Sequence, residues 1–135
     1  MNKAFSNSIL NLNIRSSLQP ILDNYLFENT SLAMINYHFD DKYYNFNNKF
    51  TVHKFSDFNK SSYLSACRND IDYFIIFNKK LNKEHYKIIH NILVNDSSVI
   101  LVECEFDRKK LQEEIGRYEF FKIDRIELKE KIKLF

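Results

Sequence analysis

The sequence predicts a single three-layer α/β domain over residues 1–135, with a mostly parallel sheet of about five strands. Two short segments, "YFIIF" (residues 73–77) and "VILV" (residues 99–102), are apolar on both faces, as strands of a covered parallel sheet are. Between them, residues 82–94 show the broad apolar face of a helix. Strand and helix alternate over residues 71–128, which implies right-handed crossovers.

The amino-terminal part is expected to precede this sheet as a helical segment. Apolar residues recur at three- and four-residue steps from Ile9 to Tyr25, which gives one apolar stripe. Pro20 suits the first turn of a second short helix, because its missing N–H has no helical partner there. We therefore expect a helical segment at residues 1–26 and a sheet domain at residues 31–135.

The remaining elements follow in order along the chain. Residues 31–39 and 50–57 are β-prone, "DDKYYNFNNK" between them is a polar loop, and residues 59–69 fit a short helix. In the helix expected at residues 107–116, Asp107 is the amino-terminal cap and Gly116 takes the left-handed position at the end. Residues 118–135 are strand-like and are expected to form antiparallel carboxyl-terminal strands, with a bulge or turn near Asp124 and Arg125 or a hairpin at Lys129 and Glu130.

Composition excludes several classes of site. Gly116 is the only glycine, and phosphate-cradling loops need glycine for tight turns and close backbone approach. The chain therefore lacks a Walker A motif, a GxGxxG loop, a nucleophile elbow and a kinase loop. Neither Cys67 nor Cys104 follows a metal-binding spacing, so we expect no metal and no cofactor.

Net charge and hydropathy limit which partners and which cellular compartment are expected. The net charge is +2, which makes nucleic acid an unlikely partner. No apolar run approaches the roughly 20 residues of a membrane span, and the first residues are too polar for a signal peptide. A cytoplasmic location is expected. The 13 phenylalanines and eight tyrosines fit AT-rich codon usage. They also allow a nucleic-acid-binding surface around "KYYNF" (residues 42–46), which is the weakest of the three functional hypotheses.

Polar residues at strand ends are the candidate ligand-binding residues. In a parallel sheet these ends gather along one edge, where open α/β folds bind ligands. The alternative is that such residues only cap the following helices. Of the other reactive side chains, His85 is expected to be packed and hydrogen-bonded, and Cys104 to be inert. The candidate ligand-binding residues are Asp40, Asp57, Asn78, Glu103 and Glu105.

The segment from Asp57 to Phe135 resembles the second half of a class I, S-adenosylmethionine-type methyltransferase, a Rossmann-like fold. The resemblance lies in the order of Asp57, "NDIDYFIIFN", "NKEHYKIIHNIL", "SSVILVE" and "IGRYEFFKIDRIEL". It implies S-adenosylmethionine as a ligand, with Asp57 and Asn78 near the adenine and the substrate. After "SLAMINYHF", however, the chain has "DDKYYNFNNK" where the family has a glycine-rich turn, which favours a non-catalytic member.

Two functional hypotheses from different classes follow. The first is a non-catalytic cytoplasmic protein that binds a protein partner or its own copies, as an accessory subunit or adaptor. It depends on the absence of a catalytic constellation and on the amphipathic amino-terminal segment. The alternative is a degenerate methyltransferase-like enzyme or a small-ligand-binding domain that uses the acidic edge of the sheet.

Overall fold

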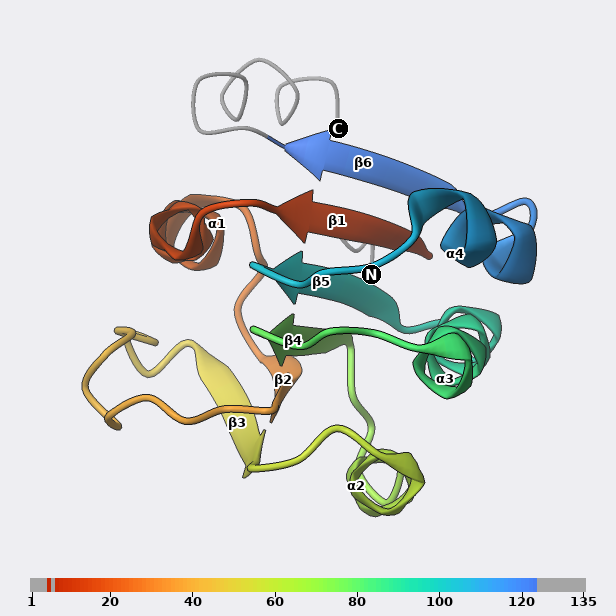
Figure 1. Cartoon of the computed structure of the whole chain (residues 1–135). Helices are drawn as coiled ribbons and strands as arrows, with labels where there is room; N and C mark the ends of the chain where they lie inside the picture. Colours follow the sequence, from red (N-terminus) through yellow and green to blue (C-terminus); the bar gives the residue numbers. More distant parts are fainter. Residues whose placement is uncertain (1–4, 6, 124–135) are drawn as a thin grey trace.

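The computed structural model describes residue 5 and residues 7–123, and these form an α/β domain around one six-stranded sheet (Figure 1). All five strand pairings are parallel, and the strand order is β3-β2-β4-β5-β1-β6. The sheet thus has one strand more than the sequence predicted. The strands are β1 (Ser8–Leu12), β2 (Thr30–Ile35), β3 (Phe50–Phe55), β4 (Tyr73–Phe77), β5 (Ser98–Val102) and β6 (Glu119–Ile123).

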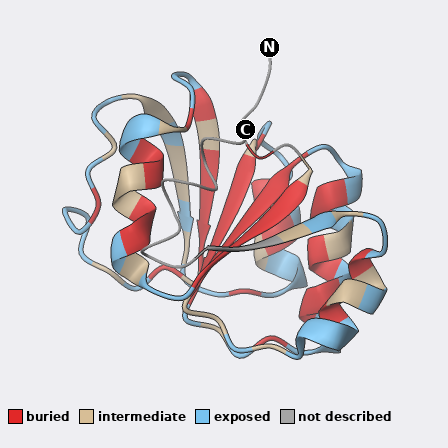
Figure 2. Ribbon diagram, turned by 90° about the horizontal axis from the view of Figure 1, so that it is seen from above, coloured by how far each residue is buried: buried red, intermediate tan, exposed pale blue. Residues whose placement is uncertain are grey.

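The helices cover both faces of the sheet, and their buried sides face it (Figure 2). One face packs against α1 and the β2–β3 loop, and the other against α2, α3 and α4. Alternate residues of β1, β2, β4 and β5 enter the two cores, as Ile100 and Leu101 of β5 do. The helical elements are the 3₁₀ turn η1 (Arg15–Ser17), α1 (Leu18–Asn24), α2 (Lys60–Ala66), α3 (Lys83–Val94) and α4 (Arg108–Ile115).

The expectation of a wholly helical amino-terminal segment is wrong. Strand β1 lies inside the sheet between β5 and β6, with Ile9 paired to Val99 on one side and Phe120 on the other. Ile9 and Leu10 are fully buried on opposite faces of the sheet. Adjacent apolar residues are compatible both with the apolar stripe of a helix and with a strand that is covered on both faces. Burial on both faces of the sheet is what favours the strand here. Within the described part of this segment the helical elements are η1 and α1, and Pro20 lies in the first turn of α1 as predicted.

The expectation of an antiparallel carboxyl-terminal strand is also wrong. Strand β6 runs parallel to β1 over five residue pairs, from Ser8 with Glu119 to Leu12 with Ile123. Helix α4 carries the chain back to the amino ends of the strands, so the next strand enters the sheet in the parallel direction. The bulge expected near Asp124 and the hairpin expected at Lys129 and Glu130 lie outside the described residues.

Helices α2, α3 and α4 begin at side-chain caps, and the cap predicted at Asp107 is confirmed. Asn59 and Asn82 close capping boxes at α2 and α3, and the Asp107 carboxylate accepts a hydrogen bond from the Lys110 N–H at the start of α4. Gly116 ends α4 with φ 63° and ψ −117°, so its φ is positive as predicted, but its ψ is not that of the left-handed position. These angles belong to the first central position of a type II′ turn, which strongly favours glycine. None of the helices in the described part of the chain is long and apolar enough to cross a bilayer.

Candidate functional site

The carboxyl ends of the strands meet along one edge of the sheet because the strands are all parallel. The residues that directly follow β2, β4 and β5 are Asn36, Asn78 and Glu103, and each has a positive φ between 46° and 57°. This conformation is costly for residues other than glycine, and asparagine tolerates it best. Asparagine and one glutamate therefore make the sharp turns at this edge in a chain with one glycine.

The crevice between β2 and β4 is filled by the protein's own side chains. The connections leave β2 and β4 for opposite faces of the sheet, which is the arrangement that opens a ligand crevice in α/β folds. Here the Asn36 amide donates to the Phe77 carbonyl oxygen at 2.7 Å. The rings of Tyr37, Phe39 and Tyr44 pack on Phe77 with centroid distances of 5.3, 5.5 and 5.9 Å. The β2–β3 loop thus occupies the position where a dinucleotide commonly binds.

This packing corrects the picture of residues 40–49 as a polar loop. Tyr44 is buried, and its hydroxyl donates to the Arg15 carbonyl oxygen at 3.3 Å. Burial raises the pKa of Tyr44 above its usual value. Of the aromatic residues in "KYYNF", only Tyr43 is well exposed, at 47%. Most of the aromatic side chains in this loop are therefore core residues.

Arg15 and Glu103 form an ion pair at the same edge. The guanidinium Nε lies 2.8 Å from a Glu103 carboxylate oxygen, and the guanidinium carbon lies 5.0 Å from the Phe39 ring centroid. Hydrogen bonds with Tyr43 and Glu103 raise the pKa of Arg15. Glu103 is thus held by a cation, and its carboxylate stabilises the turn after β1 as well as the end of β5.

The other predicted site residues are placed along this edge without forming one cluster. The Asp40 carboxylate accepts from the Lys42 N–H at 2.9 Å, which makes it part of a local turn. Asp57 is exposed after β3, and helix α2 is capped by Asn59 instead. The Asn78 N–H donates to the Val102 carbonyl oxygen at 2.9 Å. Asp40 and Asp57 belong to the β2 and β3 end of the sheet, whereas Glu105 follows β5.

A groove of about 380 Å³, called the edge groove here, lies where the chain leaves β1 and β5. Asn11 is only 6% exposed in β1, and its side-chain amide donates to the Asn13 side-chain oxygen at 3.3 Å. The β5–α4 connection contributes Glu105, which sequence reasoning predicted, and the first turn of α4 contributes Arg108. The edge groove is lined by Asn11, Asn13, Cys104, Glu105, Phe106, Arg108 and Phe120.

The edge groove has an apolar wall beside its polar side chains. The Phe106 and Phe120 rings meet edge to face with centroids 5.7 Å apart, and the Arg108 guanidinium carbon lies 4.5 Å from the Phe120 centroid. Cys104 donates to the Ile76 carbonyl oxygen at 3.3 Å, and burial raises the pKa of its thiol to about 11. A protonated, hydrogen-bonded thiol is a poor nucleophile at neutral pH. The predicted inert role of Cys104 agrees with this geometry.

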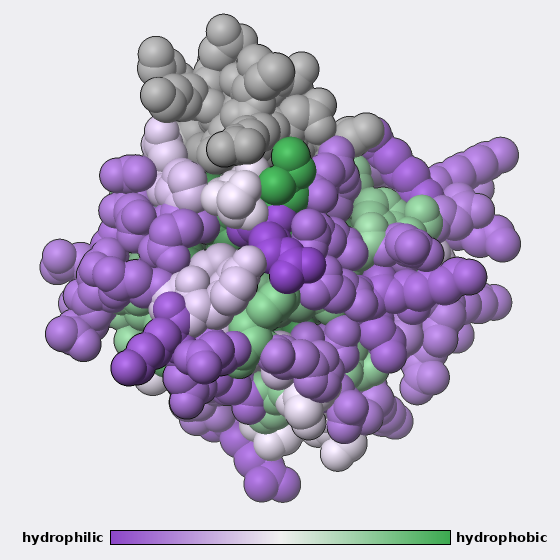
Figure 3. All heavy atoms as spheres, turned by 60° about the vertical axis from the view of Figure 1, so that its left-hand side comes forward, coloured by the Kyte–Doolittle hydropathy of each residue, from purple (hydrophilic) through white to green (hydrophobic). Residues whose placement is uncertain are grey.

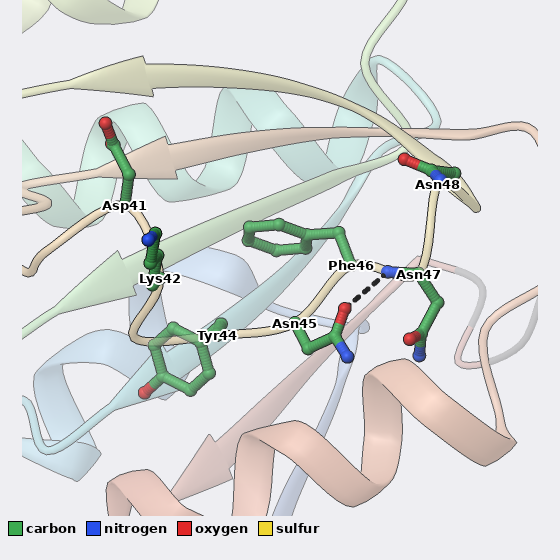
Figure 4. Close-up of a pocket in the computed structure, with 7 residues that line it drawn as sticks. All are labelled: Asp41, Lys42, Tyr44, Asn45, Phe46, Asn47 and Asn48. Carbon is green, nitrogen blue, oxygen red and sulfur yellow. Dashed lines mark hydrogen bonds between the residues drawn. The ribbon is translucent and has the colours of Figure 1, made fainter.

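Two other hollows have polar side chains that already serve the fold. One hollow, of about 730 Å³, is lined by the β2–β3 loop (Figure 4). In this loop the Asn45 side-chain oxygen accepts a hydrogen bond from the Asn47 N–H at 2.9 Å. Gln19 and Asp23 of α1 bind the same two asparagines and hold the loop on the helix. The other hollow, about 610 Å³, lies between α3 and α4, where Asn82 and Asp107 are the helix caps.

The histidine prediction is confirmed for His85. It is 8% exposed and stacks on Phe58 with ring centroids 4.6 Å apart. Its Nδ1 accepts from the Asn82 N–H at 3.0 Å, which leaves Nε2 as the donor to the Phe58 carbonyl oxygen at 3.1 Å. No group of three or more His, Cys, Asp or Glu side chains within residues 5 and 7–123 is arranged to hold a metal ion.

Sequence reasoning missed most of the edge groove. Asn11 was placed in a helix, although an amide flanked by Leu10 and Leu12 in a buried strand would have been a signal for a polar opening in the core. Arg108 and Phe120 carry no local signal, because only the β5–α4–β6 connection brings them together. Comparison of the chain with protein-family models, curated proteins and solved structures finds no match.

Proposed function

We propose that this domain binds a small polar molecule in the edge groove. The observation that carries the proposal is Asn11, an amide that lines the groove from a strand whose other four residues are also buried. A buried polar group costs free energy unless it is well hydrogen-bonded. The Asn11 amide has one long bond to Asn13, and a ligand in the groove would complete its hydrogen bonding.

The location and size of the edge groove support this reading. It lies at the carboxyl ends of parallel strands, where open α/β folds place their ligands. Its volume of about 380 Å³ is near the lower end of the range of about 300–1,000 Å³ for ligand sites. A single-ring molecule suits this volume better than a dinucleotide does.

The first test is a screen of small polar fragments by ¹⁵N–¹H correlation spectroscopy, with S-adenosylmethionine included for the methyltransferase-like alternative. We expect hits to shift the backbone signals of Glu105 and Arg108 and the side-chain amide signals of Asn11. Arg108→Ala should weaken these hits, while Lys109→Ala, the adjacent exposed cation on α4, should not. Hits that map elsewhere, or a complete absence of hits on the folded protein, would refute the proposal.

A second candidate function is binding of a protein partner at the same edge of the sheet. Ile14 is 40% exposed and Tyr43 is 47% exposed, and both lie next to Arg15. Tyrosine and arginine are among the residue types that dominate interface energetics, and Ile14 adds exposed apolar surface beside them. In Figure 3 this side of the molecule is mostly hydrophilic with small, separate hydrophobic areas, which fits a limited interface. The amino-terminal segment no longer supports this function, because its stripe is core.

Native mass spectrometry of the protein isolated gently from its host distinguishes the two candidates. A retained mass of the size of a single-ring molecule supports the ligand-binding function. A complex with a second polypeptide or a second copy supports the interaction function, provided that Tyr43→Ser with Ile14→Ser dissociates it and Phe27→Ser does not. Phe27 is a suitable control because it is 44% exposed and lies outside this patch.

A further inference from the structure

We propose that the ligand of the edge groove is a neutral ring that carries several hydroxyl groups, such as a pentose or a hexose. This inference rests on the proposed function and specifies the chemical class of its ligand. Three properties of the groove lead to it: the hydrogen-bonding groups, the balance of charge and the apolar wall.

The hydrogen-bonding groups offer both donors and acceptors at short range. Asn11 presents its side-chain oxygen as an acceptor, since its NH₂ group already donates to the Asn13 oxygen; Glu105 presents acceptors, and Arg108 presents donors. A hydroxyl group donates one hydrogen bond and accepts others, so adjacent hydroxyls on a ring match such a mixed set. A carboxylate or phosphate only accepts, and would leave the oxygens of Asn11 and Glu105 without a hydrogen-bond donor from the ligand.

The charges among the described lining residues cancel. Glu105 contributes one negative charge and Arg108 one positive charge. The nearby Asp107 carboxylate caps α4, and Glu103 is paired with Arg15. Cys104 is protonated at neutral pH. The groove therefore provides no excess of positive charge for an anion and no excess of negative charge for a cation.

The apolar wall suits the less polar side of such a ring. Phe106 is half-buried and meets Phe120 edge to face, so part of its surface faces the groove. The carbon-bound hydrogens of a sugar ring form an apolar patch between its hydroxyls, and an aromatic side chain can cover that patch. The Arg108 guanidinium already lies over Phe120, which leaves Phe106 for the contact.

The test is a titration of the full chain with D-ribose and D-glucose, and in parallel with inorganic phosphate and acetate. We expect the sugars to shift the side-chain amide signals of Asn11 and Asn13 in a saturable way. Asn11→Leu should weaken this binding by about tenfold, the equivalent of one hydrogen bond. Asn91→Ala, on the exposed side of α3, should leave it unchanged.

The possible outcomes separate this inference from the function on which it rests. Phosphate or acetate binding in the groove without sugar binding would overturn the ligand class and leave the proposed function standing. No shift at the groove with any of the four probes or with the fragment library would overturn both. If Asn11→Leu fails to fold, Glu105→Gln replaces it, because Glu105 is exposed and its loss of charge should also weaken sugar binding.

Discussion

Replacement of Asn36 tests the idea that asparagine makes the turns for which other chains use glycine. Asn36 has φ 57° directly after β2, and its side chain donates to the Phe77 carbonyl oxygen at 2.7 Å. Asn36→Ala removes the hydrogen bond and puts a residue that disfavours positive φ at the turn. Asn36→Gly removes the same hydrogen bond but keeps a residue that adopts this conformation freely.

The expected magnitudes follow from these two contributions. The lost hydrogen bond is worth about 1 kcal/mol, and the left-handed conformation costs alanine about 1–2 kcal/mol. We therefore expect Asn36→Ala to lower the free energy of unfolding by about 2–3 kcal/mol. For Asn36→Gly we expect about 1–2 kcal/mol, because the greater freedom of the unfolded chain adds to the lost bond.

Urea denaturation followed by far-UV circular dichroism measures both variants, since the chain has no tryptophan. With a slope of about 2 kcal/mol per molar urea, Asn36→Ala should lower the midpoint by about 1–1.5 M. Asn29→Gly is the control, because Asn29 has φ 63° and its side chain makes none of the hydrogen bonds seen among the described residues. It should change the stability by less than about 0.5 kcal/mol. Equal losses for Asn36→Ala and Asn36→Gly would show that the turn is not strained and refute the reasoning.

Three further predictions concern the titratable groups. Burial lowers the folded-state pKa of His85 below its unfolded value. The neutral His85 therefore contributes stability above about pH 6.5, and this contribution is lost as the pH falls through that value toward the folded pKa. The urea midpoints at pH 8 and pH 5 should differ less in His85→Leu than in the unchanged protein. Alkylation of the native protein near pH 7.5 should modify the exposed Cys67 and spare Cys104, so mass spectrometry that shows both thiols modified at similar rates would contradict the burial of Cys104. Glu103→Gln should lower the free energy of unfolding by up to about 1 kcal/mol at low salt, and a loss that persists undiminished in 1 M NaCl would argue against the half-exposed ion pair with Arg15 as its cause.

The candidate site was predictable only in part. Its general location followed from the polar residues after the strands, because parallel strands bring their carboxyl ends to one edge. Of the predicted residues, Glu105 lines the edge groove, whereas Glu103 is paired with Arg15 and Asp40 belongs to a local turn. Asn11 was missed because the strand that carries it was not recognised.

The sequence by itself determined the elements between residues 50 and 116. Their strands are short, rich in β-branched and aromatic residues, and separated by helices with asparagine or aspartate caps, so local preference and burial agree. The single glycine also has a local reason, since Gly116 takes backbone angles that side chains disfavour.

Only the tertiary structure decided the place of β1 and the direction of β6, which are neighbours at one side of the sheet, and the edge groove. "SILNL" contains too few residues for its periodicity to separate a strand from a helix, and its pairing with β5 and β6 settles the matter. The direction of β6 follows from the return of the chain through α4. The edge groove exists because that same return brings Arg108 and Phe120 beside Asn11, which is distant in the sequence.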